Sequence, residues 1–200
     1  MVRQSHYPSF DVLRETDAWD DHTQSIVTSR VRPKTNFQFL TKQETELLRA
    51  ICSLLVDDQR LNVLSYVLEH IDQTLTQAIG EGQRKAGVPN EQILIREGLQ
   101  AIDAAARQLH ATPFTHLKEE QQTELLQALS QGHGNTEASP TWDPAWQQPL
   151  FDKLLTLTIE SYCSHPAVWS EIGYAGPAYP RGYVRTQLGQ LDPWEAQPES

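Results

Sequence analysis

The chain has 200 residues and a formal net charge of −10, with 16 Lys and Arg against 26 Asp and Glu. This length is typical of a single domain, and the acidic balance excludes the basic surface that attracts nucleic acid or an anionic membrane. The clearest apolar runs, such as residues 50–56, are much shorter than the roughly 18 residues that span a bilayer. The composition therefore predicts no nucleic-acid partner and no membrane span.

The first 36 residues are polar and show neither the period of an amphipathic helix nor that of a strand. We expect residues 1–36 to form a polar N-terminal arm that lies on another surface. The first helix is expected to begin near Thr41, because Thr41 and Glu44 have the spacing of a capping box.

Leucine-rich stripes at spacings of three and four residues predict further helices from about residues 61, 90, 116 and 149. Pro149 suits the first position of the last helix, and Pro166, which lacks a backbone donor, predicts its end at His165. Residues 131–148 are rich in turn formers and predict an internal crossover loop. The expected fold is all-α, with about five helices in a single bundle-like domain. The apolar faces are predicted to include Leu61, Leu109 and Ile159.

The two cysteines, Cys52 and Cys163, lie far apart and form no C-x-x-C motif, which excludes a disulfide framework. We expect both to be buried thiols in helices, and the alternative is a link to a partner chain. Gly-rich phosphate loops, H-E-x-x-H, G-x-S-x-G and the Rossmann fingerprint do not occur, and the histidines are dispersed. The sequence therefore predicts no catalytic, cofactor-binding or metal-binding residue in this chain.

Residues 165–185, HPAVWSEIGYAGPAYPRGYVR, differ from the rest of the chain in their density of Gly, Pro and aromatic residues. We expect a rigid, non-helical segment, called here the C-terminal strap. One interpretation is that the strap wraps and locks the helical core, and the other is that it forms a preformed interface, where Tyr, Trp and Arg are typical anchors. The candidate interface residues are His165, Trp169, Glu171, Tyr174, Tyr179, Arg181 and Tyr183.

The stretch ESYCSHPAVWSEIGYAGPAYPRGYVR resembles the C-terminal part of the gluconate 2-dehydrogenase subunit 3 family. FLTKQETELLRAICSLLV is similar to the opening helix of that family, YVLEHIDQTL to its second helix and GEGQRKAGVP to the loop that follows. The resemblance covers residues 37–185, the expected helical small-subunit domain, and leaves residues 186–200 as a C-terminal tail.

The resemblance implies an accessory role in an oxidoreductase complex. The large subunit of such complexes is a flavoprotein of the glucose-methanol-choline type, which holds FAD and oxidises sugars, polyols or sugar acids. A cytochrome c subunit often takes the electrons. The small subunit is similar to a folding or export escort that stays bound, and no catalytic residue is established on it.

Two features depart from the family pattern. No twin-arginine export signal precedes Phe37, so we expect a cytoplasmic complex, with co-export to the periplasm as the alternative. Cys163 takes the place where relatives often have an aromatic residue before S-H-P, and in the cytosol it should remain a thiol.

Two other functions stay open on the sequence. The chain is alternatively a stand-alone enzyme or sugar-binding protein that uses the strap as its site, with His165, Glu171, Tyr179 and Arg181 as acid, base and substrate clamp. A third interpretation is a helical adaptor with no flavoprotein partner.

Overall fold

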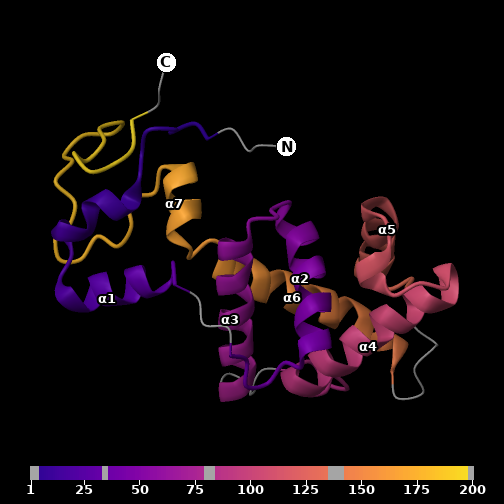
Figure 1. The fold of residues 1–200 in the computed structure, drawn as a ribbon. Coiled ribbons are helices and arrows are strands. Elements are labelled where there is room, and N and C mark those ends of the chain that lie inside the picture. Colours follow the sequence, from indigo (N-terminus) through magenta and orange to yellow (C-terminus); the bar gives the residue numbers. More distant parts are fainter. Residues whose placement is uncertain (1–4, 33–35, 79–83, 135–141, 198–200) are drawn as a thin grey trace. The chain divides into compact units, whose positions relative to one another are not determined.

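The computed structural model describes residues 5–32, 36–78, 84–134 and 142–197 (Figure 1). Within these ranges the chain forms helices and no strand, which confirms the all-α prediction. The α-helices are α1 (Asp21–Ser29), α2 (Lys42–Val56), α3 (Leu61–Gln77), α4 (Glu91–His110), α5 (Glu119–Ser130), α6 (Gln147–Tyr162) and α7 (Pro166–Ile172). Short 3-10 helices are η1 (Val12–Ala18), η3 (Phe114–His116) and η4 (Pro144–Trp146). The predicted number of about five helices was too low.

The chain divides into two compact units, where the sequence predicted a single bundle. The central unit is Lys34–Ser161 and contains the helices from α2 to α6. The terminal unit joins the two ends of the chain, Met1–Pro33 and Tyr162–Ser200, and contains η1, α1 and α7. The expected crossover loop at 131–148 lies in the central unit and includes η4, although residues 135–141 are outside the described ranges.

The central unit follows the predicted leucine stripes. The capping box at the start of α2 is present, since Thr41 Oγ1 accepts from Glu44 N–H and Glu44 Oε2 accepts from Thr41 N–H. Gly98 permits close packing of α4 on α6, because a Cβ at this position would lie 2.4 Å from Leu150 Cδ2. The fully buried leucine and isoleucine side chains of this core are Leu48, Ile51, Leu68, Ile71, Leu75, Ile95, Leu99, Leu129, Leu150 and Leu154.

Some predicted details of the helices were wrong. Leu61, Leu109 and Ile159 are exposed. They lie at or near helix ends or at the margin of an apolar stripe, where spacing alone does not decide burial. The last long helix starts at Gln147, which places Pro149 within the first turn, a part of a helix that tolerates proline.

A buried carboxylate fixes the segment that leads into α2. Asp72 on α3 is 3% exposed and accepts from the backbone N–H groups of Gln38, Phe39 and Leu40 at 2.8 to 2.9 Å. These amides precede the helix and have no partner within it, so the carboxylate supplies the acceptors that a buried backbone requires.

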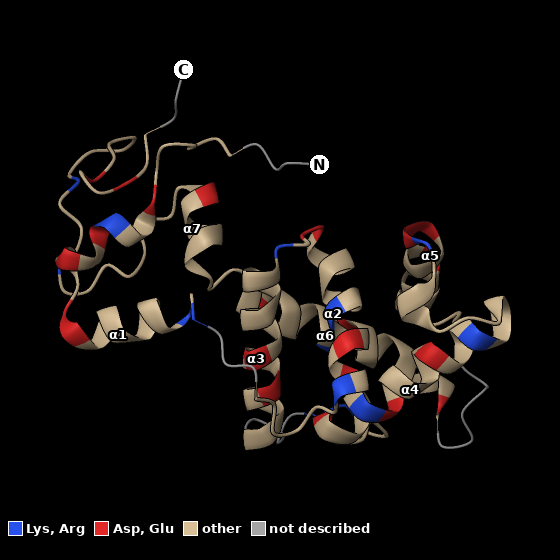
Figure 2. Ribbon diagram, viewed as in Figure 1, with Lys and Arg blue, Asp and Glu red and all other residues tan. Residues whose placement is uncertain are grey.

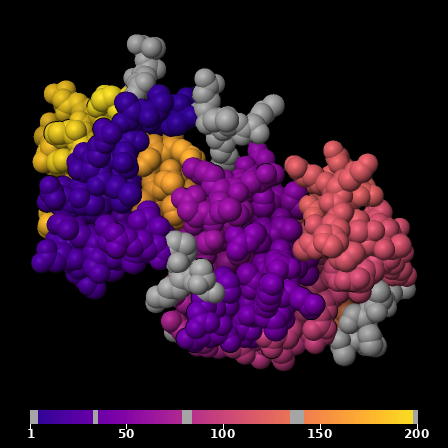
Figure 3. Space-filling view, viewed as in Figure 1, coloured from indigo at the N-terminus to yellow at the C-terminus, as the bar shows by residue number. Residues whose placement is uncertain are grey.

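In the terminal unit, residues 12–18 and 21–29 are helical, which their polarity did not predict. Asp11 caps η1 and Asp20 caps α1 through their side chains. Val12, Trp19 and Val27 from this part pack with Trp169 of α7 in one buried cluster. Figure 3 shows the indigo N-terminal residues against the yellow C-terminal ones within this unit.

The beginning of the C-terminal strap is helical, and the prediction of a non-helical segment from residue 165 was wrong. α6 ends at Tyr162, and Pro166 is the first residue of α7. Proline disfavours helix before it but suits the first helical position, because its missing N–H would have no intrahelical partner there. Beyond α7, Gly176 has a φ of +81° and leaves room for Trp19, whose Cζ2 would lie 2.5 Å from a Cβ.

Candidate partner interface

Two of the predicted interface residues are buried in the terminal unit. His165 is 0% exposed and caps α7, with Nδ1 accepting from the backbone N–H of Ala167 at 3.1 Å. The Trp169 indole donates to the carbonyl of Cys163 at 2.6 Å and has the guanidinium of Arg30 at 5.2 Å from its ring centroid. Both side chains therefore fix the first part of the strap within the terminal unit.

The other predicted aromatic residues are exposed. Tyr179 is 71% exposed and Tyr183 65%, while Tyr174 is half exposed and packs edge-on against Trp169 with ring centroids 5.3 Å apart. Burial raises the pKa of the Tyr174 hydroxyl, and the neighbouring Tyr183 raises it further. Glu171 is partly buried, and its carbonyl accepts from Ser5 Oγ.

The exposed tyrosines belong to a segment that contains several exposed large hydrophobic side chains. Seven of the exposed large hydrophobic side chains of the described residues lie within 172–191. We call this set the C-terminal patch, and it consists of Ile172, Tyr174, Tyr179, Tyr183, Val184, Leu188 and Leu191. Exposed apolar groups that gather in one segment are typical of a surface that contacts another protein.

The same segment stands apart in charge. Residues 172–191 contain no Asp or Glu, and Arg181 and Arg185 give them a formal charge of +2. The rest of the chain therefore has a formal charge of −12, and the two parts together give the net charge of −10. Figure 2 shows red acidic positions on the helices of both units. The C-terminal patch thus comes from an acid-free segment of an acidic protein.

Arg181 lies under this surface. Its side chain is 7% exposed, and Nη2 donates to the carbonyl of Ala175. The guanidinium carbon is 4.9 Å from the ring centroid of Trp194 and 5.9 Å from that of Trp19. Glu15 is the partner of its ion pair, at 3.9 Å between Nη1 and Oε2. Burial lowers the pKa of Arg181, and the nearby Glu15 opposes that shift.

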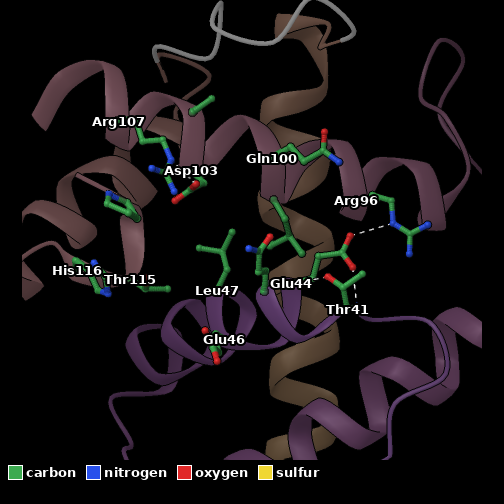
Figure 4. A pocket seen from close by; sticks show the side chains of 14 residues that line it. Thr41, Glu44, Glu46, Leu47, Arg96, Gln100, Asp103, Arg107, Thr115 and His116 are labelled. Atoms are coloured by element: carbon green, nitrogen blue, oxygen red, sulfur yellow. Dashed lines mark hydrogen bonds and ion pairs between the residues drawn. The ribbon is translucent and has the colours of Figure 1, made fainter. Parts of the chain in front are cut away.

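The central unit has a groove of about 730 Å³ between α2, α4 and η3 (Figure 4). Leu47 and Leu99 line it, and ion pairs neutralise most of its charges: Glu44 with Arg96 at 2.9 Å and Asp103 with Arg107 at 2.8 Å. Although burial alone would raise the pKa of Glu44, hydrogen bonds from Thr41 and Arg96 lower it. Because its charged groups pair with each other, the groove is a weaker candidate than the C-terminal patch.

The two cysteines of the chain are free thiols that differ in burial. Cys52 is buried, with Sγ 3.3 Å from Thr158 Oγ1, and burial raises its pKa to about 12. Cys163 is exposed, so the prediction of two buried thiols held only for Cys52. Among these residues, His, Cys, Asp and Glu do not form a group of three or more suited to a metal ion. Nor does any helix in the described ranges have the length and apolarity to cross a membrane.

The structure does not bring the residues of the stand-alone enzyme hypothesis to one open site. His165 is fully buried and its Nδ1 is engaged in capping, and Arg181 is almost as deeply buried. Sequence reasoning missed Ile172, Val184, Leu188 and Leu191 of the patch. The acid-free run from 172 to 191 is the signal that would have found them.

The described residues thus form an all-helical fold with a concentration of exposed apolar side chains in residues 172–191. The family model described as gluconate 2-dehydrogenase subunit 3 matches residues 42–176, and the chain belongs to this family. The matched range includes His165, Trp169, Glu171 and Tyr174 and ends before Tyr179. Comparisons with curated proteins and with solved structures found no significant match.

Proposed function

We propose that this chain is a non-catalytic accessory subunit that stabilises, matures or positions an FAD-dependent dehydrogenase of the glucose-methanol-choline type. The family's description as a dehydrogenase subunit supports an assembly with other chains. The observation that carries the contact site is the concentration of exposed apolar side chains in residues 172–191. In this proposal the large subunit holds FAD and oxidises a sugar, polyol or sugar acid.

The chemistry of the patch fits a lasting protein contact. Tyrosine is enriched among the residues that dominate binding energy, because it buries a large ring and keeps a polar tip. Trp169 and the His165 cap of α7 fix the chain directly before residues 172–191. Part of the conformational entropy that binding would cost is therefore already lost in the free chain. We therefore assign the contact to Tyr174, Tyr179 and Tyr183, with His165 and Trp169 as supports.

Co-purification from the native host tests the proposal. We expect the tagged chain to bring down a large subunit in fixed stoichiometry, with flavin absorbance that stays with the large subunit after the two are separated. A cytochrome c in the same eluate would support the electron acceptor that we propose. A colourless chain without a large partner would contradict the assignment. The cytoplasmic location stays a prediction, which cell fractionation tests.

Substitutions locate the contact. The double variant Tyr179→Ala/Tyr183→Ala should weaken binding of the large subunit by about 700-fold, since hot-spot residues contribute about 2 kcal/mol each and every 1.4 kcal/mol is about tenfold. Leu61→Ala is the matched control, because Leu61 is also 71% exposed but lies on the central unit. If the control weakens binding as much as the double variant, the contact lies elsewhere.

A further inference from the structure

The cluster around Arg181 contains hydrogen-bond donors that lack acceptors. Arg181 Nε and Nη1 and the indole Nε1 of Trp19 are buried and make no hydrogen bond. The Nη1 atom is 3.9 Å from Glu15 Oε2, which is too long for a hydrogen bond. The rings of Trp19 and Trp194 attract the cation through their faces but accept no conventional hydrogen bond from it.

The nearby carboxylate of Asp192 is committed elsewhere. Its Oδ1 accepts from the backbone N–H groups of Val184 and Arg185, both at 2.7 Å, and these two bonds fix its orientation. Its Oδ2 is 3.9 Å from Arg185 Nε and makes no hydrogen bond. Asp192 therefore contributes negative potential near Arg181 without satisfying its donors.

A buried guanidinium in this state is costly. Each buried donor without an acceptor loses the hydrogen bond that it makes with water in the unfolded chain, and the cost is larger when the group is charged. Native proteins rarely keep several such atoms together, so the cluster requires an explanation. A ligand that supplies the acceptor is one explanation, and its chemistry follows from the guanidinium, which binds carboxylates best.

We propose that the large subunit places an Asp or Glu side chain on Arg181 when the two chains assemble. This inference rests on the proposed function and adds the chemistry of the contact. Tyr179 and Tyr183 lie two residues before and after Arg181 and are exposed, so they form the aromatic rim of the proposed contact site. The buried guanidinium of Arg181 is the polar centre of that site. Because the Arg181 side chain is 7% exposed, this contact requires the guanidinium to become accessible when the two chains assemble.

The chemistry of the guanidinium favours an acidic side chain from the partner over other occupants. Residues 172–191 lack acidic groups, so the negative groups that an incoming carboxylate meets near Arg181 are Glu15 and Asp192, which lie outside the segment. The rim and centre then match the usual anatomy of a hot spot, in which a charged group is desolvated inside a ring of apolar contacts. Such a pair is worth most when water is excluded, and its loss increases the dissociation rate.

The test compares Arg181→Met, Arg181→Lys and Arg185→Met, with two measurements on each. The first is the affinity for the purified large flavoprotein subunit. We expect Arg181→Met to weaken it about 100-fold and Arg181→Lys about 10-fold, because lysine keeps the charge but lacks the planar fork. Arg185→Met is the matched control on the same segment, since Arg185 already has Glu195 at 3.3 Å, and its affinity should change less than about threefold.

The second measurement is the urea midpoint of each isolated chain. We expect Arg181→Met to unfold at the same or a higher urea concentration than the unchanged chain, because the variant no longer buries an unsatisfied cation. The combination of intact stability and weakened binding is specific to a receptor for the partner's carboxylate. Double-mutant cycles that pair Arg181→Met with single neutral substitutions of the partner's acids should find one non-additive pair.

Other outcomes overturn the inference in distinguishable ways. If Arg181→Met destabilises the isolated chain and leaves affinity unchanged, Arg181 is an internal lock between η1 and the C-terminal segment. If Arg181→Met changes neither the affinity nor the stability, the carboxylate contact is also refuted, but the accessory-subunit function is not affected. If the unchanged chain binds no flavoprotein subunit, both the inference and the proposed function fail.

Discussion

The two units of this chain differ in how completely they bury their large hydrophobic side chains. The central unit buries leucine and isoleucine stripes from successive helices, and its exposed large hydrophobic residues are scattered along α3, α4 and α6. The terminal unit has a small core of Val12, Trp19, Val27 and Trp169, beside a segment that leaves seven large hydrophobic side chains in solvent. The central unit thus has the residues of a self-sufficient core, whereas the terminal unit carries residues that only a second surface would bury.

Removal of Trp169 should have the largest effect on stability. Trp169→Ala deletes a buried ring, its hydrogen bond to Cys163 and its contact with Arg30, so we expect a loss of about 4 kcal/mol in the free energy of unfolding. Tyr179→Ala should change it by less than about 0.5 kcal/mol, because the ring is exposed. Urea unfolding of the isolated chain, followed by tryptophan fluorescence, measures both. Equal losses would remove the distinction between support and contact residues.

Asp72 provides the corresponding test in the central unit. Asp72→Ala leaves the N–H groups of Gln38, Phe39 and Leu40 without their acceptor, and we expect a loss of about 3 kcal/mol. Asp72→Asn keeps one acceptor oxygen and should lose about half as much. Circular dichroism during urea unfolding reports the change, and Asp152→Ala, at an exposed position on α6, is the control with a change near zero. A loss below about 1 kcal/mol for Asp72→Ala would mean that water replaces the carboxylate.

The predictability of each unit follows from where its contacts come from. The start of α2 was predictable because Thr41 and Glu44 are three residues apart and make their bonds locally. The fold of η1 and α1 was not, since Val12, Trp19 and Val27 are buried by Trp169, more than 140 residues along the chain. Short polar helices of this kind depend on tertiary packing more than on their own sequence.

The candidate site shows the same limit. The sequence showed that the strap is rich in Tyr, Trp and Arg. It did not show which of these side chains are buried and which are exposed. Trp169 faces the core and Tyr179 faces solvent, although both occur in the same aromatic stretch, because α7 gives the first part a helical period that the second part lacks. Proline at the start of α7 signals either an end or a beginning, and only the packing of Trp169 decides between them.

Glu44 gives the smallest expected effect and tests whether the caps of the central unit act through charge. Glu44→Gln keeps the hydrogen-bonding pattern of the capping box and removes the negative charge beside Arg96, so we expect a loss of about 1 kcal/mol near neutral pH. The folded chain holds the pKa of Glu44 below its ordinary value of 4.5. The stabilisation is therefore complete above the unfolded pKa and is lost as the pH falls through the folded pKa.

The difference between the unchanged chain and Glu44→Gln should consequently be constant above about pH 6 and shrink below pH 4.5. Urea midpoints measured across this range test the sign, with Glu46→Gln as the control, since Glu46 lies on the same helix, is exposed and lacks the bond to Arg96. A difference that persists unchanged in acid would show that the hydrogen bonds of Glu44 to Thr41 and Arg96, and not its charge, stabilise the start of α2. In that case the start of α2 would depend on local hydrogen bonding, and the charge contrast within the chain would be confined to the acid-free segment 172–191.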